Sequence, residues 1–339
     1  MLYGIAAATA ALFLSAVLTA LVRAPALRLK LLDRRRQRPL PLGGGAAVVL
    51  VTCLVAAAGD VTGTGPLDTD TVRLLVAGAA VAALGLVADV RRVKARFLLG
   101  GTAVAAACAV PYAETGVVGG IAAVCWIVVV TLAFRALDHA DGLAATVGMV
   151  TAFGVGVCAA AEVLDGLAVL LSVLAAALTG FLMHNWHPAR VGLGACGSLF
   201  AGFTLAAAAV VTRAGHEGAA SAGVLFALAA VAGADVLLVV LARRLGGRPL
   251  LRGGPDHLAH RLRRLGLTPQ GATVVLGAGA SAAVVVGVLV HLGRMAPAGA
   301  LWVAAGALIA VLLLLRVKRP QSRRTASVQV RTQLRVRNG

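Results

Sequence analysis

Long apolar runs divide this 339-residue chain into segments of nearly equal length, and this pattern is typical of membrane-spanning helices. A helix needs about 20 apolar residues to cross a bilayer. The runs that meet or approach this length lie near 2–22, 43–59, 72–88, 97–113, 117–134, 142–161, 166–183, 197–212, 219–241, 271–292 and 297–315. Basic residues follow the first run instead of preceding it, unlike a cleaved signal peptide. The sequence therefore predicts an all-α polytopic integral membrane protein with about eleven transmembrane helices.

The basic residues predict the orientation of these helices. Of the 31 Lys and Arg residues, 28 lie in one alternating set of loops and in the C-terminal segment. The opposite set of loops holds only Arg73, Arg213 and Arg294. The excess of basic residues marks the cytoplasmic side, so we expect the N-terminus outside and the C-terminus inside the cell. Residues 1–315 then form one transmembrane domain with cytoplasmic active-site loops, and 316–339 form a basic tail that we expect to be disordered.

The net charge of +18 first suggests a nucleic-acid partner, but the composition argues against one. Only 13% of the residues are charged and 4% are aromatic, which leaves few side chains to contact phosphates or stack on bases. We therefore expect no nucleic acid as a partner. The five cysteines form no Cys-x-x-Cys pair and lie in or beside apolar runs, which favours small buried side chains over a metal site or a disulfide.

The predicted cytoplasmic loops hold five of the seven histidines and several polar patterns. Asp138 and Asp141 are three residues apart, so on a helical turn their carboxylates would face the same way. His257 and His260 have the same spacing, which fits either a zinc ion or a phosphate group, although no cysteine or further histidine lies at ligand spacing in that loop. Asp235 lies inside a predicted span, where it marks either a transport pathway or a charge paired with a neighbouring helix.

Six motifs follow one another on the predicted cytoplasmic side. They are Pro41-Leu42-Gly43-Gly44-Gly45, Ala88-Asp89, Arg135-x-x-Asp138-x-x-Asp141-Gly142, Asn185-x-x-Pro188-Ala189, Gly194-Ala195-Cys196-Gly197-Ser198, and Asp256-His257 to His260-Arg261-Leu262. In this order they resemble the motifs of the polyprenyl-phosphate N-acetylhexosamine-1-phosphate transferases, a family that includes phospho-N-acetylmuramoyl-pentapeptide transferase and undecaprenyl-phosphate GlcNAc-1-phosphate transferase (glycosyl transferase family 4). The chain looks like a divergent member of it.

The resemblance implies transfer of a sugar-1-phosphate from a UDP-sugar to polyprenyl phosphate, with release of UMP, in the synthesis of cell-envelope polymers such as peptidoglycan. It implies a multi-pass protein of the bacterial plasma membrane whose active site faces the cytoplasm. The partners would be the polyprenyl phosphate lipid, the UDP-sugar and the membrane, together with a second copy of the chain in a homodimer. The catalytic residues would be Asp89, Asp138 and Asp141. The substrate-binding residues would be Arg135, Asn185, His257 and His260, and we expect Asp256 to orient His260 or a neighbouring arginine.

Three positions depart from the family pattern. Ala88 and Ala195 stand where the family has aspartates, and Arg135 stands where it has an asparagine. The family leads us to expect Mg²⁺, but its usual ligand positions are Arg135 and Ala195 here, which leaves Asp89, Asp138 or Asp141 to hold an ion. One hypothesis is that the Arg135 guanidinium takes the place of the ion beside the pyrophosphate. The alternatives are a catalytically impaired member acting as a scaffold or lipid-phosphate binder and, less favoured, a transporter.

Overall fold

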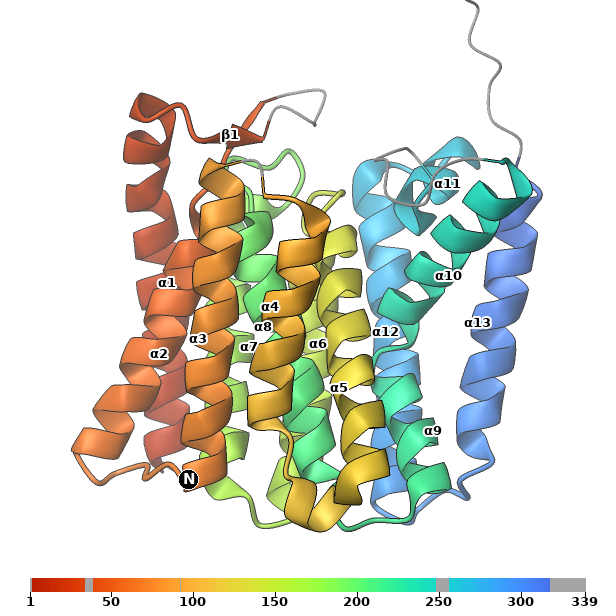
Figure 1. The fold of residues 1–339 in the computed structure, drawn as a ribbon. Helices are drawn as coiled ribbons and strands as arrows, with labels where there is room; N and C mark the ends of the chain where they lie inside the picture. The colour runs from red at the N-terminus through yellow and green to blue at the C-terminus, as the bar shows by residue number, and fades with distance from the viewer. Residues whose placement is uncertain (1, 34–38, 92, 248–255, 318–339) are drawn as a thin grey trace, which may run out of the picture.

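The computed structural model describes residues 2–33, 39–91, 93–247 and 256–317, which form a bundle of long helices (Figure 1). The first part of the chain forms α1 (Leu2–Arg28), α2 (Gly44–Val61), α3 (Thr69–Val90), α4 (Ala95–Ala109), α5 (Tyr112–Leu137), α6 (Leu143–Ala161), α7 (Asp165–Asn185) and α8 (Gly194–Thr212). The remainder forms α9 (Gly218–Leu228), α10 (Ala230–Leu245), α11 (Leu258–Arg264), α12 (Pro269–His291) and α13 (Gly299–Leu315). Two short antiparallel strands, β1 (Leu32–Asp33) and β2 (Leu40–Pro41), connect α1 to α2.

The helices confirm an all-α polytopic membrane protein. Within the described residues, eight helices are long and apolar enough to cross a membrane, and α9 with α10 qualifies as a ninth span if the pair is counted together. Each predicted apolar run overlaps a helix or this pair, although α4 and α13 are shorter, with 15 and 17 residues. The total of eleven spans and the orientation of the termini stay predictions.

The predicted span 219–241 differs from expectation because it is not one straight helix. α9 and α10 meet at Ala229 with a bend of 81°. The bend occurs together with a contact that the hydropathy of the run does not predict. Asp235 of α10 accepts a hydrogen bond from the first backbone N–H of α11. A buried carboxylate inside a span needs such a partner.

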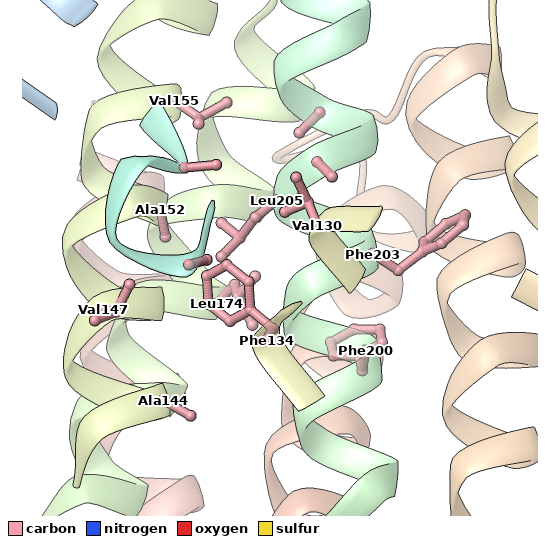
Figure 2. Close-up of a cluster of buried hydrophobic side chains, with 14 of the residues drawn as sticks. Val130, Phe134, Ala144, Val147, Ala152, Val155, Leu174, Phe200, Phe203 and Leu205 are labelled. Atoms are coloured by element: carbon pink, nitrogen blue, oxygen red, sulfur yellow. The ribbon is translucent and has the colours of Figure 1, made fainter. Parts of the chain in front are cut away.

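The core of the bundle lies around α8, which is buried along almost its whole length. Phe200 and Phe203 of α8 are fully buried, as are Phe134 of α5 and Leu174 of α7. Figure 2 shows these side chains with their neighbours from α6. Many large apolar side chains on the outer helices are instead exposed, Phe13, Leu54 and Trp302 among them. An apolar exterior around a packed interior is what a lipid environment requires.

Glycines bring α2 close to α8 at one end of the bundle. A Cβ atom on Gly45 would overlap the backbone of Leu193 and Gly197, and one on Gly44 would overlap the ring of Phe181. Leu42 also forms a parallel bridge with Gly192. The Gly-rich motif thus lets α2 start directly against other backbone. These contacts also fix the segment before α8, whose first turn lies in the candidate site.

Other predictions meet the structure in part. Cys158 and Cys196 are buried, as expected, but Cys108 and Cys125 are exposed, so the expectation of buried cysteines is only partly met. β1, β2 and α11 lie at the end of the bundle opposite the start of α1 (Figure 1), which is the end predicted to face the cytoplasm. The arginines of 34–38 and most of the predicted disordered tail, 318–339, lie outside the described residues.

Candidate active site

The family-type motifs converge at the end of the bundle that carries β1, β2 and α11 (Figure 1). Asp89 lies in the last turn of α3, Asp138 directly follows α5, and Asn185 ends α7. α8 begins at Gly194 in the same region, so four helix ends meet there. The packing of these helix ends therefore brings together Asp89 and Cys196, which are 107 positions apart in the sequence.

The first turn of α8 is the centre of this region. Asp89 accepts hydrogen bonds from the backbone N–H groups of Ala195 (2.8 Å) and Cys196 (3.0 Å). Asp138 accepts another from Gly194 (3.1 Å). A helix N-terminus has unpaired N–H groups and a partial positive charge, so it favours such carboxylates. Asp89 and Asp138 therefore stabilise the first turn of α8. Both residues also lie in the region where the motifs predict a site.

Arg135 supplies a cation next to these carboxylates. Its Nη1 atom lies 3.8 Å from Oδ2 of Asp138. The Arg135 side chain keeps 32% of its surface exposed, whereas that of Asp138 keeps 5%. The guanidinium therefore lies over a buried carboxylate and remains accessible to an anion that approaches from outside the bundle.

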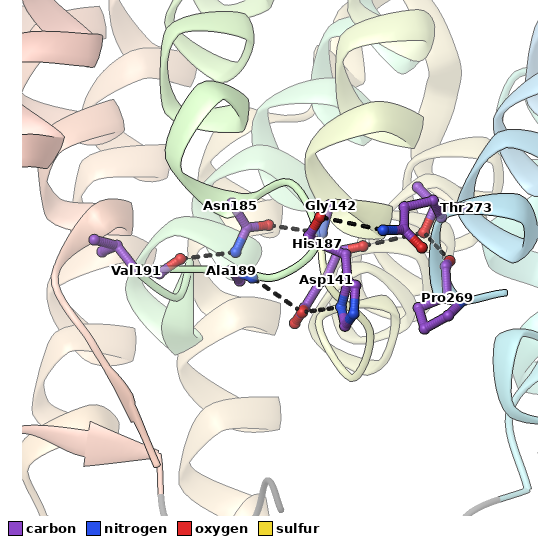
Figure 3. A network of polar contacts seen from close by, with 9 residues as sticks. Asp141, Gly142, Asn185, His187, Ala189, Val191, Pro269 and Thr273 are labelled. Atoms are coloured by element: carbon purple, nitrogen blue, oxygen red, sulfur yellow. Dashed lines mark hydrogen bonds and ion pairs between the residues drawn. The ribbon is translucent and has the colours of Figure 1, made fainter. Parts of the chain in front are cut away.

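Asp138 and Asp141 do not share one helical turn, so that expectation was wrong. α5 ends at Leu137, and Asp138 is the residue that caps it. The carboxylate of Asp141 accepts hydrogen bonds from the backbone N–H of Ala189 (3.2 Å) and lies 2.8 Å from Nδ1 of His187 (Figure 3). The chain turns away from the helix because Gly142 adopts a positive φ of 72°, a backbone conformation suited to glycine. The two carboxylates thus contact different partners.

Asn185 joins two loops of the site. Its side-chain oxygen accepts a hydrogen bond from the N–H of Gly142 (2.9 Å), and its side-chain nitrogen donates one to the carbonyl of Val191 (2.8 Å). The residue is only 2% exposed. Figure 3 shows both bonds, with Thr273 of α12 closing the network by donating to the carbonyl of Asp141 (3.0 Å). Asn185 therefore positions the segment after Asp141 and the segment before α8.

The histidines form a second cluster, next to α10 and α11. His257 caps the start of α11, and its Nδ1 lies 2.8 Å from Oδ2 of Asp235. Its ring stacks on that of His139, with centroids 4.1 Å apart, and the ring of His260 lies edge-on to His139 at 4.8 Å. Burial lowers the pKa of His139 to about 3. Burial and the nearby His257, Arg263 and Arg264 lower the pKa of His260 to about 4.

Sequence reasoning missed two residues of this region. His139 stands between the two motif aspartates and comes from a different loop, so the search for ligand spacing around His257 and His260 could not find it. His187 contacts Asp141 across 46 positions. The one sign in the sequence that His139 and His187 belong to the site is that both lie inside motifs shared with the family. The carboxylate of Asp256 lies 3.7 Å from Arg243 and 4.0 Å from Arg261, contacts that fit the predicted role of orienting a neighbouring arginine.

The positions of the family's magnesium site do not fit that ion in this structure. Ala195 has no ligand atom, and the carboxylates of Asp138 and Asp141 contact different partners. Among the described residues, the group of three ionisable side chains that comes close enough to share a metal ion is His139, Asp235 and His257. That set is rich in nitrogen, whereas Mg²⁺ prefers oxygen ligands in octahedral geometry.

A small cavity borders Asp89, between the starts of α2 and α8 and the end of α3. Its volume is ≈ 30 Å³, and its lining is almost entirely apolar. A space of this size holds about one water molecule. This cavity alone is therefore too small to hold a lipid phosphate beside Asp89.

Comparison with known proteins identifies the family. Residues 71–213 match the model of glycosyl transferase family 4, and this range contains Asp89, Arg135, Asp138, Asp141 and Asn185. A protein of Streptomyces coelicolor named "Putative glycosyltransferase" is 66% identical over 321 residues, covering 94% of this chain and 78% of that protein.

Two further relatives have more specific names and cover less of the chain. The decaprenyl-phosphate N-acetylglucosaminephosphotransferase of Mycolicibacterium smegmatis is 34% identical, over 42% of this chain and 40% of its own. The phospho-N-acetylmuramoyl-pentapeptide-transferase of Moorella thermoacetica is 35% identical, over 39% and 40%. This chain thus spans less than half the length of these two relatives. The long match to the Streptomyces protein and the family model agree, and the chain therefore belongs to glycosyl transferase family 4 as a membrane transferase of the phosphosugar class.

Proposed function

We propose that this protein transfers a sugar-1-phosphate, of the N-acetylhexosamine type, from a UDP-sugar to undecaprenyl or another polyprenyl phosphate at the cytoplasmic face of the plasma membrane. An oxygen of the lipid phosphate attacks the phosphorus that carries the sugar. A new P–O bond forms, the pyrophosphate bond breaks, and UMP leaves. The names of the Mycolicibacterium and Moorella relatives support a polyprenyl-linked reaction of this type.

The observation that carries the proposal is the convergence of Asp89, Arg135 and Asp138 on the first turn of α8. The reaction gathers an anionic lipid head and a pyrophosphate, so the site must offset negative charge and position both groups. Arg135 supplies an accessible cation, and the start of α8 supplies a partial positive charge. The buried carboxylate of Asp138 fixes Arg135 in place.

The residues at the positions of the family's magnesium site indicate a specific role for Arg135. Its guanidinium stands where the family has an asparagine, and Ala88 and Ala195 stand where the family has carboxylates. A fixed positive charge would neutralise the pyrophosphate where the family relies on a divalent ion. We therefore expect added Mg²⁺ to change the rate less than about twofold. A rate that is restored by Mg²⁺ alone after treatment with a chelator would contradict this role.

The direct test uses the purified full chain in lipid nanodiscs with undecaprenyl phosphate and a panel of radiolabelled UDP-sugars. We expect lipid-linked product and an equal amount of UMP from at least one sugar. Asp138→Asn and His260→Ala should lower the rate at least about 100-fold, as expected when a charge-positioning group is removed. Asp70→Asn and His216→Ala are the matched controls, since both residues lie at the other end of the bundle and are exposed or half-buried. Controls that lose activity equally would contradict the site.

The impaired-member alternative has its own supporting observation. Asp89 and Asp138 both hold the start of α8, a structural task that a protein without turnover would also need. This alternative predicts no product from any UDP-sugar together with retained binding of UDP-sugar or lipid phosphate. Counterflow of a solute in sealed vesicles would instead support a transporter. Asp235, which first raised that idea, is paired with His257 and α11.

A further inference from the structure

Three side chains from separate parts of the chain meet beside α11. His139 lies in the connection between α5 and α6, Asp235 lies in α10, and His257 caps the start of α11. One nitrogen of each histidine and one oxygen of the aspartate lie within 4.8 Å of one another. Two imidazoles and one carboxylate from three elements form a donor set typical of zinc sites.

His139 has an imidazole nitrogen that lacks a partner. Its Nδ1 lies 2.8 Å from the carbonyl oxygen of Ala136, which can only accept, so Nδ1 carries the proton of the neutral ring. The other nitrogen, Nε2, then presents a lone pair. It is buried and has no hydrogen-bond partner among the described residues. A histidine that donates through one nitrogen to a backbone carbonyl and leaves the other free is arranged as metal-bound histidines are.

Asp235 supplies the negative charge. It is fully buried inside a span, which is costly unless the charge is compensated. One oxygen accepts the N–H of Leu258 (2.8 Å), and the other lies 2.8 Å from Nδ1 of His257. The ring of His139 stacks on that of His257 beside this contact, and the ring of His260 lies edge-on to His139. A carboxylate grouped with two imidazoles offers oxygen and nitrogen ligands to one cation.

We propose that His139, Asp235 and His257 bind one divalent transition-metal ion of the zinc class. Zinc lies about 2.0–2.2 Å from nitrogen and oxygen ligands, so tetrahedral ligands are about 3.3 Å apart. The widest separation in the cluster therefore has to shrink by about 1.5 Å on binding, a change that side-chain rotation can supply. Three protein ligands leave a fourth position for water or an anionic oxygen, and His260 lies beside it. The nitrogen ligands select against Mg²⁺.

This metal site goes beyond the proposed transfer reaction and does not depend on it. The site is tested by measuring the metal content of the protein, and this measurement requires no catalytic turnover. The ion would also link the loop between α5 and α6 to α10 and α11, at the end of the bundle where the motifs converge (Figure 1).

The experiment uses the full-length chain in nanodiscs, stripped of metal with a chelator and then dialysed against Zn²⁺, Co²⁺ or Mg²⁺. We expect one zinc per chain by elemental analysis, the visible absorption of tetrahedral Co²⁺, and no retained Mg²⁺. Zinc should also raise the unfolding temperature, because it binds the folded state. His139→Leu and His257→Ala should each weaken zinc binding at least tenfold, whereas His216→Ala, at the opposite end of the bundle, should leave it unchanged.

Several results would overturn the proposal. One is substoichiometric zinc in the wild-type chain, and another is zinc binding that survives both His139→Leu and His257→Ala. Loss of zinc in His216→Ala alone would place the ion at the other end of the bundle. If the variants do not fold, X-ray absorption of the zinc-loaded wild-type chain decides the matter. At least two imidazole ligands and no sulfur support the site, and any other ligand set refutes it.

Discussion

Replacement of Asp89 by alanine should destabilise the folded chain, because this carboxylate caps the first turn of α8. It accepts N–H bonds from Ala195 (2.8 Å) and Cys196 (3.0 Å), and the alanine variant leaves both donors without it. Loss of a helix cap costs about 0.5–2 kcal/mol, and loss of a charge next to a helix N-terminus adds about 0.3–1 kcal/mol. Asp89 is half-buried, so water replaces part of the lost contact. We therefore expect a loss of about 2 kcal/mol, or about a 30-fold shift in the unfolding equilibrium.

Asp89→Asn separates the charge from the hydrogen bonds. The amide oxygen can still accept one N–H, but the NH₂ group now faces the second donor, so about 1 kcal/mol should be lost. The assay is reversible unfolding in mixed micelles, followed by circular dichroism, with Asp70→Asn as the control. An Asp89→Ala variant within about 0.5 kcal/mol of the wild type would refute the capping argument. If this variant is stable and yet loses transferase activity, the role of Asp89 is catalytic instead.

Three further experiments test other contacts by thermal unfolding in the same micelles. Asn185→Ala should cost about 2–3 kcal/mol, since it leaves two buried backbone groups unpaired; a change below about 1 kcal/mol would mean that water enters the site. Gly45→Ala should cost at least about 1–3 kcal/mol by forcing α2 away from α8, whereas Gly100→Ala, which meets open space, should not destabilise the chain. Asp141→Asn and His187→Ala should show a coupling of about 0.5–3 kcal/mol in a double-mutant cycle, and additive effects would deny their contact.

The spacing of apolar runs predicted most of the fold because each span must satisfy its own backbone hydrogen bonds in lipid. The ends of spans were therefore placed to within a few residues, and the motifs at those ends fell in one region. The bend at Ala229 could not be predicted in this way, since it accompanies a contact between Asp235 and the distant start of α11. Hydropathy measures the residues of one run and carries no information on which distant N–H group a buried carboxylate will meet.

The candidate site shows the same division between local and distant information. Motif order identified Asp89, Asp138 and Asp141, but their partners are backbone groups far along the chain. The expected shared turn of Asp138 and Asp141 failed because α5 ends at Leu137, before either residue. His139 was overlooked because ligand spacing was sought within one loop. Metal ligands from three separate elements have no characteristic spacing in the sequence, so only the folded chain brings them together.

The three departures from the family pattern make sense as one change in charge. Ala88 and Ala195 remove two carboxylates, and Arg135 adds one positive charge. If a magnesium ion no longer occupies the site, two positive charges leave as well, so the total charge near the start of α8 differs from the family's by a single unit. Random loss of function would not be expected to keep the total charge of the site so nearly constant. Loss of an acid alone would leave the site with uncompensated charge. The balance of charge also predicts an asymmetry: Arg135→Asn alone should abolish transfer, while the same change combined with Ala195→Asp should restore transfer that depends on magnesium. If the double variant stays inactive at every magnesium concentration while its fold is intact, the guanidinium does not stand in for the ion.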